Sequence, residues 1–247
     1  MAELNISIKL VDVEKYLLEN RALNGISIEF SPGMLHGIVG ADGAGKTTLL
    51  RTLIGLLRPD SGQIIFRQNG KAIEFPEIRD CLAYLPQQQS LYPDLSCIEH
   101  LDFFRDLYKL PQNIYLRKRD ELLHIMRLEK FKNRKAGELS GGMYKKLGVM
   151  CALLQSPEVL LLDEPTNGVD PISRRELWDL FYRLASENIL ILISTSYMDE
   201  AERCARVHVL EYGKCLFSGE PRAILKQQKA AKFEDIFISR ALYQKQN

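Results

Sequence analysis

The sequence has no long apolar run. Its longest runs, such as Ile189–Ile193, fall far short of the roughly 20 residues that a membrane-spanning helix needs. The first residues, Met1–Asn5, lack the charged and then apolar layout of a signal peptide. We therefore expect a cytoplasmic protein that does not span a bilayer on its own.

Paired cysteines and an excess of one charge are also missing. The five cysteines are odd in number and show no Cys-x-x-Cys spacing, which argues against a disulfide framework or a zinc knuckle and predicts buried thiols. With 33 basic and 32 acidic side chains the net charge is +1, so no nucleic-acid partner is expected. What remains is 247 residues, 46% of them hydrophobic, which is typical of a globular chain with a sizeable core.

Hydrophobic periodicity predicts two kinds of strand. Apolar residues alternate roughly with polar ones over Ile6–Val13 and Ser27–Phe30, which predicts a half-exposed antiparallel sheet. Val159–Leu162 and Ile189–Ile193 are instead continuous apolar runs bounded by helical stretches. Strands that are buried on both faces belong in a parallel sheet covered by helices. The pattern therefore predicts an α/β fold.

A glycine turn and a long helical region lie between these strands. Met34–Val39 is an apolar run followed by glycine, and Thr48–Leu57 has the apolar spacing of a helix. This part predicts a strand, a glycine turn and a helix. From about Cys97 to Leu154 the spacing is helical throughout, which predicts a helical insertion.

The glycine turn fits a phosphate-binding pattern of Gly, four residues and Gly-Lys-Ser/Thr. Its members are Gly40, Ala41, Asp42, Gly43, Ala44, Gly45, Lys46 and Thr47. The glycines let backbone N–H groups turn toward phosphates, and the following helix adds its dipole. Lys46 can bring a charge to the β and γ phosphates, and Thr47 can bind Mg²⁺. A merely tight turn is the alternative, which the predicted strand and helix on either side argue against.

Two carboxylates, Asp163 and Glu164, follow the predicted strand Val159–Leu162. Such a pair offers a metal ligand and a residue that orients or deprotonates water. On its own, an acidic pair at a strand end is more often a helix cap or a solvated turn. The phosphate-binding pattern upstream favours the catalytic interpretation.

Five motifs occur in an order that is typical of one family. They are Gly40–Thr48, Tyr84–Gln87, Leu139–Gly142, Leu162–Pro165 and Asn167–Asp170. Together they resemble the ATP-binding subunit of an ABC transporter over nearly the whole chain. Two further segments, Leu91–Leu95 and Tyr197–Glu202, resemble the ABC-2 type exporter subfamily, which includes bacterial multidrug export ATPases.

The resemblance implies an α/β fold with a P-loop NTPase core. Such a fold has a mostly parallel sheet, an N-terminal antiparallel β element and an inserted α-helical subdomain. A single ABC-type ATP-binding domain would occupy residues 1–247. The core would comprise 1–96 and 157–228, the helical subdomain with the signature motif 97–156, and a short C-terminal extension 229–247.

The resemblance also implies residues that bind ATP and Mg²⁺. The nucleotide contacts would be Tyr16, Gly40, Ala41, Asp42, Gly43, Ala44, Gly45, Lys46, Thr47 and Thr48. The Mg²⁺ ligands would be Thr47, Gln87 and Asp163. The catalytic residues would be Glu164, Gln87, Lys46 and Ser196. Glu164 would polarise the attacking water, and Tyr16 would stack on adenine unless it is a plain strand-end tyrosine.

The resemblance implies partners as well. The signature residues are Leu139, Ser140, Gly141, Gly142 and Met143. In the family they close over the ATP of the opposite subunit in a head-to-tail dimer, and Asp170 would connect the two sites. The second ATP-binding subunit can be identical or different. Separate membrane-spanning subunits would dock in a groove near Gln87 to Asp94 and carry the transport path.

Two positions depart from the family pattern. Ser196 stands where a switch histidine is usual, and Met143 stands where glutamine is more common. The four histidines are elsewhere, and their apolar neighbours predict packing: His36, His100, His124 and His208. Serine is shorter than imidazole and is not cationic near neutral pH. Because a lost donor costs about 10²- to 10³-fold in rate, we expect slow turnover at this site unless Tyr197, a water or a partner residue replaces the histidine.

The sequence leaves three functions open. The leading one is an ATPase that drives an exporter. The second is a soluble ABC-type ATPase without a transport role, against which the lack of a long coiled-coil insertion argues. The third is a nucleotide-binding regulatory subunit with little hydrolysis, which Ser196 favours and Glu164 opposes. The transported molecule cannot be inferred, because the family selects cargo in its membrane subunits.

Overall fold

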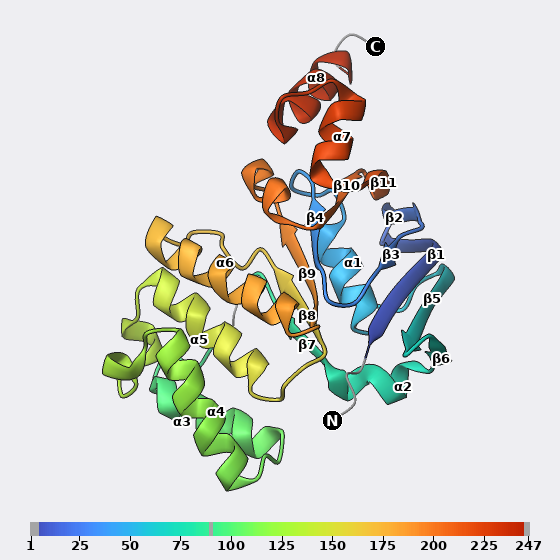
Figure 1. Ribbon diagram of the computed structural model, residues 1–247. Helices are drawn as coiled ribbons and strands as arrows, with labels where there is room; N and C mark the ends of the chain where they lie inside the picture. The colour runs from blue at the N-terminus through green and yellow to red at the C-terminus, as the bar shows by residue number, and fades with distance from the viewer. Residues whose placement is uncertain (1–4, 89–90, 245–247) are drawn as a thin grey trace.

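The computed structural model describes residues 5–88 and 91–244, with side chains described as far as Arg240. Three short segments lie outside the described residues: 1–4, 89–90 and 245–247. The first belongs to the N-terminal stretch in which no signal peptide was predicted, the second to the predicted docking groove, and the third to the predicted C-terminal extension. Figure 1 shows a central sheet with a second sheet on one side, a helical lobe on the other, and the C-terminal helices at one end. None of the helices that the structure describes is long and apolar enough to cross a membrane.

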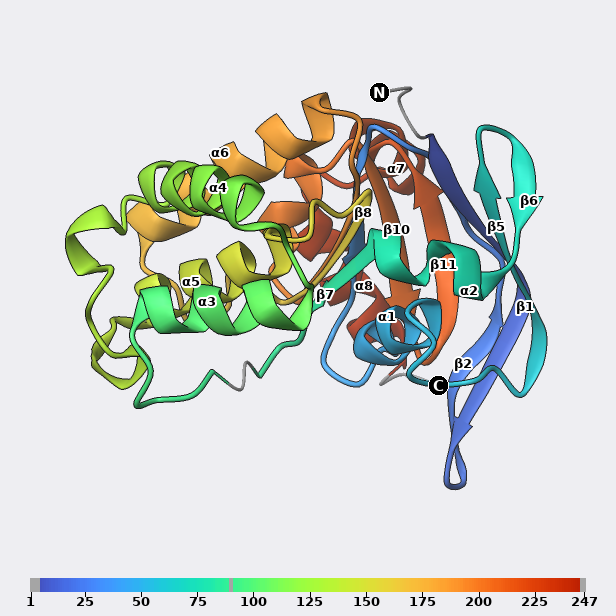
Figure 2. The same cartoon turned by 90° about the horizontal axis from the view of Figure 1, so that it is seen from below.

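The second sheet is antiparallel and is built from the first part of the chain. Its strands are β1 (Ile6–Leu17), β2 (Asn20–Ile26), β3 (Glu29–Phe30), β5 (Ser61–Gln68) and β6 (Lys71–Ile73). The β1–β2 hairpin extends beyond the rest of this sheet (Figure 2). The predicted strand Ser27–Phe30 is shortened to Glu29–Phe30, because the Ser27 hydroxyl instead bonds the backbone and carboxylate of Asp12, each at 2.9 Å.

The central sheet has the strand order β11-β10-β4-β9-β8-β7. Its strands are β4 (Leu35–Val39), β7 (Leu82–Leu85), β8 (Val159–Asp163), β9 (Leu190–Thr195), β10 (Arg206–Glu211) and β11 (Lys214–Gly219). Neighbouring strands from β10 to β7 are parallel, and β11 pairs antiparallel with β10. This arrangement confirms the predicted α/β fold with a mostly parallel sheet and an N-terminal antiparallel element.

The central strands divide the hydrophobic core into two parts. Along β8, Val159 and Leu161 pack toward the antiparallel sheet, whereas Leu160 and Leu162 pack toward the helical side. All four are fully buried. Because successive side chains of a strand point to opposite faces, a strand covered on both sides must be apolar at every position. The carboxylates of the strand end then emerge at the edge of the sheet.

Helices cover both sides of the central sheet. Their bounds are α1 (Lys46–Leu53), α2 (Phe75–Ile78), α3 (Cys97–Leu107), α4 (Gln112–Ile125), α5 (Gly141–Leu153), α6 (Pro171–Ser186), α7 (Pro221–Gln228) and α8 (Phe233–Gln244). Short 3₁₀ helices lie at Arg79–Cys81, Glu129–Phe131, Ala136–Glu138 and Met198–Arg203. Helices α3, α4 and α5 form the lobe of Figure 1, so the helical insertion is confirmed. The division into numbered domains stays a prediction.

Helix α1 occupies Lys46–Leu53 rather than the predicted Thr48–Leu57. It ends early because Gly55 adopts a left-handed φ of 75°. The N–H of Gly55 donates to Thr52 O at 3.2 Å and that of Leu56 donates to Arg51 O at 2.9 Å, the two bonds of a Schellman motif. The apolar pattern continues past the helix and therefore overestimates its length.

Histidines and cysteines mostly follow the predicted packing. His36, His100 and His208 are fully buried, but the packing prediction is wrong for His124, which lies on the exposed face of α4 and pairs with Glu129. All five cysteines are free; Cys97, Cys151 and Cys204 are buried, whereas Cys81 and Cys215 are half-buried.

Candidate active site

The phosphate-binding loop connects β4 to α1 through two positions that only glycine can occupy. A Cβ on Gly45, whose φ is 104°, would lie 2.5 Å from Ala22 O. A Cβ on Gly40 would lie 2.4 Å from Leu210 O. The loop is thus clamped between β2 and β10, and it leads directly into the first turn of α1, whose free N–H groups favour anions.

Lys46 lies inside this loop and is 5% exposed. Its ammonium donates to the carbonyl oxygens of Gly40 at 2.9 Å and Ala41 at 3.1 Å. Oε1 of Glu164 is 3.5 Å away. A buried ammonium needs such partners, and phosphate oxygens are stronger acceptors than carbonyls. The lysine is therefore placed to exchange carbonyl partners for phosphate.

Asp163 ends β8 with a fully buried carboxylate. Its Oδ1 accepts hydrogen bonds from Thr47 Oγ1 at 3.1 Å and from Ser194 Oγ at 2.5 Å. Its Oδ2 accepts from Tyr84 Oη at 3.1 Å. Burial and the nearby Asp163 charge raise the pKa of Tyr84 to about 12, so its hydroxyl remains a donor. Three elements thereby orient one carboxylate next to the loop.

Glu164 is the next residue, and it has an unusual backbone. Its φ is 47°, in the left-handed region that non-glycine residues avoid, and its side chain is only 6% exposed. Oε2 accepts two hydrogen bonds, from Gln87 Nε2 at 2.8 Å and from Asn167 Nδ2 at 3.1 Å. The turn points Glu164 across the loop instead of back into the sheet, beside the Lys46 ammonium.

Gln87 links this site to the helical lobe. While its side chain donates to Glu164, its carbonyl accepts a hydrogen bond of 2.8 Å from Lys145 Nζ on α5. Burial lowers the pKa of Lys145, although the nearby carboxylates of Glu164 and Asp163 favour its charged form. A shift of α5 is therefore transmitted to the residue that holds Glu164.

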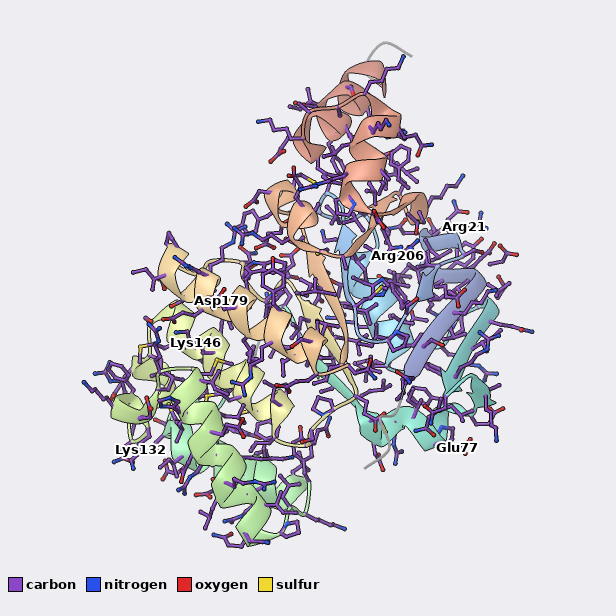
Figure 3. The ribbon with its side chains drawn as sticks, viewed as in Figure 1. Arg21, Glu77, Lys132, Lys146, Asp179 and Arg206 are labelled. Carbon is purple, nitrogen blue, oxygen red and sulfur yellow. The ribbon has the colours of Figure 1, made fainter. Side chains whose placement is uncertain are left out.

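A hollow of about 290 Å³ opens over the loop. It is lined by Leu17, Asn20, Ala22, Asp42, Gly43, Ala44, Gly45, Lys46, Thr47, Thr48, Gln87 and Glu164. The structure thus brings together most of the predicted nucleotide-binding residues. Tyr16 lies next to Leu17 but does not line the hollow; it is 44% exposed, and the Arg21 guanidinium, labelled in Figure 3, lies 5.8 Å from the centre of its ring. Its role at adenine stays a prediction.

The switch position lies just beyond β9. Ser196 is half-buried, and its hydroxyl forms no hydrogen bond with any residue that the structure describes. The next side chain does: Tyr197 Oη donates to Asn167 Oδ1 at 3.1 Å. Asn167 in turn contacts Glu164. The tyrosine therefore reaches the site indirectly where the serine does not.

The signature residues lie apart from this hollow, at the start of α5. Ser140 Oγ accepts from Met143 N at 3.3 Å and caps the helix, and both Ser140 and Gly141 are exposed. Asp170 caps α6 by accepting from the N–H groups of Ile172 and Ser173. Lys146, labelled in Figure 3 beside α5 and α6, holds these two helices together through an ion pair with Glu176.

Four contacting residues were given no role by sequence reasoning. They are Tyr84, Lys145, Asn167 and Ser194. Tyr84 and Asn167 belong to recognised motifs; Tyr84 lies near the end of β7, and Asn167 follows β8. Their positions in these motifs are the sequence signal that could have identified them. Lys145 and Ser194 reach the site only through the packing of α5 and β9, and one sequence holds no signal for that.

Comparisons with known proteins agree with this geometry. The family model described as ABC transporter matches residues 23–167. Over 87% of the chain, the sequence is 43% identical to the probable multidrug ABC transporter ATP-binding protein YbhF of Escherichia coli (strain K12), and this match covers 37% of that protein. It is 35% identical to the Nod factor export ATP-binding protein I of Burkholderia orbicola (strain AU 1054), covering 92% of the chain and 75% of that protein.

The solved structures show a matching fold. The structure of an ATP-binding subunit of an ABC transporter superposes with a TM-score of 0.82 at 28% identity, covering 94% of this chain and 98% of that one. The chain spans little more than a third of the length of the multidrug relative but three quarters of the Nod factor relative. The shared region thus corresponds to one ATP-binding unit in each.

Proposed function

Because this chain belongs to the ABC transporter family as an ATP-binding domain, we propose that it binds and hydrolyses ATP to drive export through separate membrane-spanning subunits. The observation that carries the proposal is one hollow over the phosphate-binding loop that is lined by Lys46 and Glu164, with Asp163 directly behind it on the hydroxyl of Thr47. Family members are ATPases, and two relatives are named as a probable multidrug ABC transporter ATP-binding protein and a Nod factor export ATP-binding protein. The resemblance found in the sequence is confirmed.

The donor set fits a magnesium ion that accompanies ATP. Thr47 Oγ1 and Asp163 Oδ1 lie 3.1 Å apart at the edge of the hollow, and both are the hard oxygen ligands that Mg²⁺ prefers. Mg²⁺ usually takes only one or two protein oxygens together with phosphate oxygens and waters. When bound, the ion would neutralise charge on the phosphates. Gln87 completes the predicted metal set.

The residues of the chain then have separate tasks. Loop N–H groups and Lys46 bind the phosphates, because both are donors directed at one concave surface. Glu164 orients the attacking water and accepts its proton, since its carboxylate is buried beside the Lys46 ammonium. Gln87 and Asn167 hold Glu164 in place. Ser196 supplies no such contact, which supports slow turnover.

Partners complete the proposal. The signature residues at the start of α5, of which Ser140 and Gly141 are exposed, lie outside the chain's own hollow, which supports their use at the ATP of a second ATP-binding subunit, identical or different. The chain would lie on the cytoplasmic face of the cell membrane, held there by membrane-spanning subunits that provide the transport path. A regulatory subunit with little hydrolysis is the second candidate, and the lack of a partner for the Ser196 hydroxyl favours it.

Nucleotide binding and turnover test the proposal. The purified chain should bind a fluorescent ATP analogue and hydrolyse Mg-ATP, and Glu164→Gln should keep binding but lose hydrolysis. Glu158→Gln is the matched control, because Glu158 lies just before the opposite end of β8. Hydrolysis that survives Glu164→Gln would contradict the assigned base, and binding without turnover in the wild type would favour the regulatory role.

The transport role needs its own measurement. ATP-dependent export should appear in vesicles that contain this chain with co-purified membrane subunits, and it should be lost with Glu164→Gln. Turnover that is unaffected by any membrane subunit would instead support a soluble ABC-type ATPase.

A further inference from the structure

We propose that Tyr197 is a positioning residue for ATP hydrolysis, acting on Glu164 through the side-chain amide of Asn167. The inference rests on the proposed function, because it concerns the step that Glu164 performs. It adds a residue to the site that none of the recognised motif roles includes. It also explains how a site without a switch histidine keeps its carboxylate in place.

A continuous chain of hydrogen bonds carries the proposal. Tyr197 Oη donates to Asn167 Oδ1 at 3.1 Å, and Asn167 Nδ2 donates to Glu164 Oε2 at 3.1 Å. The direction is fixed by chemistry, since an ionised carboxylate only accepts and Asn167 must present its NH₂ to it. The carbonyl oxygen of Asn167 then faces away from Glu164 and needs a donor, which only Tyr197 supplies among the described contacts.

The tyrosine is itself held in place. Its backbone N–H donates to Thr195 Oγ1 at 3.0 Å, and the Arg174 guanidinium lies 5.0 Å from the centre of its ring. Arg174 also donates to the buried Glu200 at 2.8 Å. The ring of Tyr197 therefore packs against the guanidinium of Arg174, which is itself held by Glu200, and this packing directs the Tyr197 hydroxyl toward Asn167 Oδ1.

One buried carboxylate ties together the two segments that meet here. Glu200 is fully buried and accepts from Thr166 Oγ1 at 2.7 Å and from Thr195 Oγ1 at 2.6 Å. Thr166 directly precedes Asn167, and Thr195 lies two residues before Tyr197. The distance between the Asn167 and Tyr197 segments is thus set by hydrogen bonds that exclude water. This makes the contact between them a built feature of the fold.

The chain of contacts matters because Glu164 has little else to hold its orientation. Its Oε2 is fixed by Gln87 and Asn167, and the carbonyl of Gln87 also accepts a hydrogen bond from Lys145 in the helical lobe. When α5 shifts Gln87, Asn167 is the donor that remains. Because misplacing a reacting group by about 1 Å costs up to 10²-fold, loosening Asn167 should cost about tenfold in kcat.

Removing only the hydroxyl of Tyr197 tests the inference. Tyr197→Phe keeps the ring beside Arg174, so we expect kcat to fall about tenfold while KM for ATP and binding of a fluorescent ATP analogue stay within about twofold. Tyr182→Phe is the matched control: Tyr182 is similarly exposed and packs against Trp178 on α6, but among the described residues its hydroxyl forms no hydrogen bond with Asn167 or Glu164. It should retain the wild-type kcat.

Two double variants separate positioning from general structure. If the residues act in series, Tyr197→Phe should add little to the loss caused by Asn167→Ala. In a Ser196→His background, the imidazole provides a direct donor to the site, so Tyr197→Phe should lower kcat by less than about twofold. A purely structural role of Tyr197 would give the same loss in both backgrounds.

The outcomes distinguish this inference from the function on which it rests. If the wild type hydrolyses ATP and Tyr197→Phe is equally fast, the positioning role is overturned and the proposed function stands. An equal loss in the Ser196→His background overturns it as well. If the wild type itself shows no single-turnover hydrolysis, the proposed hydrolysis fails, and the positioning role fails with it.

Discussion

At the scale of single residues, Ser196 is where the site differs most from its family. Its hydroxyl forms no hydrogen bond with a described residue, whereas the buried Asp163 and Glu164 have multiple donors. We expect Ser196→His to raise steady-state ATP turnover by about tenfold or more, because a donor near developing phosphate charge is worth about 10²- to 10³-fold in favourable geometry. Phosphate release from the purified chain measures this.

The control for this prediction is Ser186→His at the exposed end of α6. Ser186 is exposed and far in sequence from the site, so the substitution should leave turnover unchanged. A Ser196→His variant no faster than the wild type would show that Tyr197 and its contacts already meet the need for a donor.

Sequence reasoning reached the charged residues of the site but not their supports. Asp163 and Glu164 could be predicted because they end an apolar strand, and Lys46 because its loop has a fixed spacing. Lys145 could not, since its contact with Gln87 depends on how α5 packs against the sheet. The position of a residue relative to a strand end can be predicted from its neighbours in the sequence. A contact between two packed elements cannot, because it depends on residues far apart in the chain.

At the scale of elements, β4 and β10 are joined by a buried histidine pair. His36 Nδ1 lies 3.1 Å from His208 Nε2, so one ring must donate and the other accept. Burial lowers the pKa of His36 to about 4 and that of His208 to about 3, with the neighbouring Arg206 adding to both effects. Both imidazole rings are thus neutral in the folded protein near neutral pH.

The pair predicts a pH dependence of stability. Both folded pKa values lie below the unfolded value near 6.5, so the unfolded chain binds more protons as the pH falls below about 6.5. Stability should be full above that pH and decrease by on the order of 2 kcal/mol per histidine by pH 5. Urea unfolding at pH 7.5 and 5 measures it. The variant His36→Gln/His208→Gln should show a smaller difference; an equal difference would assign the effect to other groups.

The contact between α5 and α6 predicts a second stability effect. Lys146 is buried and pairs with Glu176, which Arg127 also contacts at 2.8 Å. Glu176→Ala should destabilise the fold by about 3 kcal/mol, because it leaves a buried charge without its partner. Glu121→Ala breaks the exposed pair with Arg183 and should cost less than about 1 kcal/mol. Equal midpoints in urea for the two variants would contradict this.

Element types were predictable, whereas element ends were not. The continuous apolar runs Val159–Leu162 and Ile189–Ile193, in β8 and β9, revealed the parallel sheet, because such runs are typical of strands that are covered on both faces. Helix α1 ends early because Gly55 turns left-handed, and β2 was missed since its pattern does not alternate cleanly. The end of α1 and the strand β2 both depend on the backbone conformation of one or two residues. Hydrophobic periodicity is judged over a longer window and does not detect such local changes.

At the scale of the whole molecule, the hollow over the loop and the signature residues lie in different parts of the chain. The hollow over the loop lacks any signature residue, and the exposed signature lies at the start of α5. In the proposed head-to-tail dimer, each hollow would meet the signature of the other copy, which is a two-fold arrangement that closes on itself. On this proposal, one chain alone would hold two incomplete sites instead of one complete site.

Mixing two inactive variants tests this arrangement. Lys46→Ala disables a chain's own hollow but keeps its signature, and Ser140→Arg does the reverse, so each alone should be nearly inactive. A mixture forms dimers with one intact composite site, and turnover should return to about a quarter of the wild-type value if copies pair at random. Lys46→Ala mixed with Glu164→Gln is the control, because both changes damage the same half and no intact site forms. A mixture that stays inactive while the purified wild type turns over would contradict the composite site, and a purified wild type that turns over only after a different ATP-binding subunit is added would indicate a heterodimer.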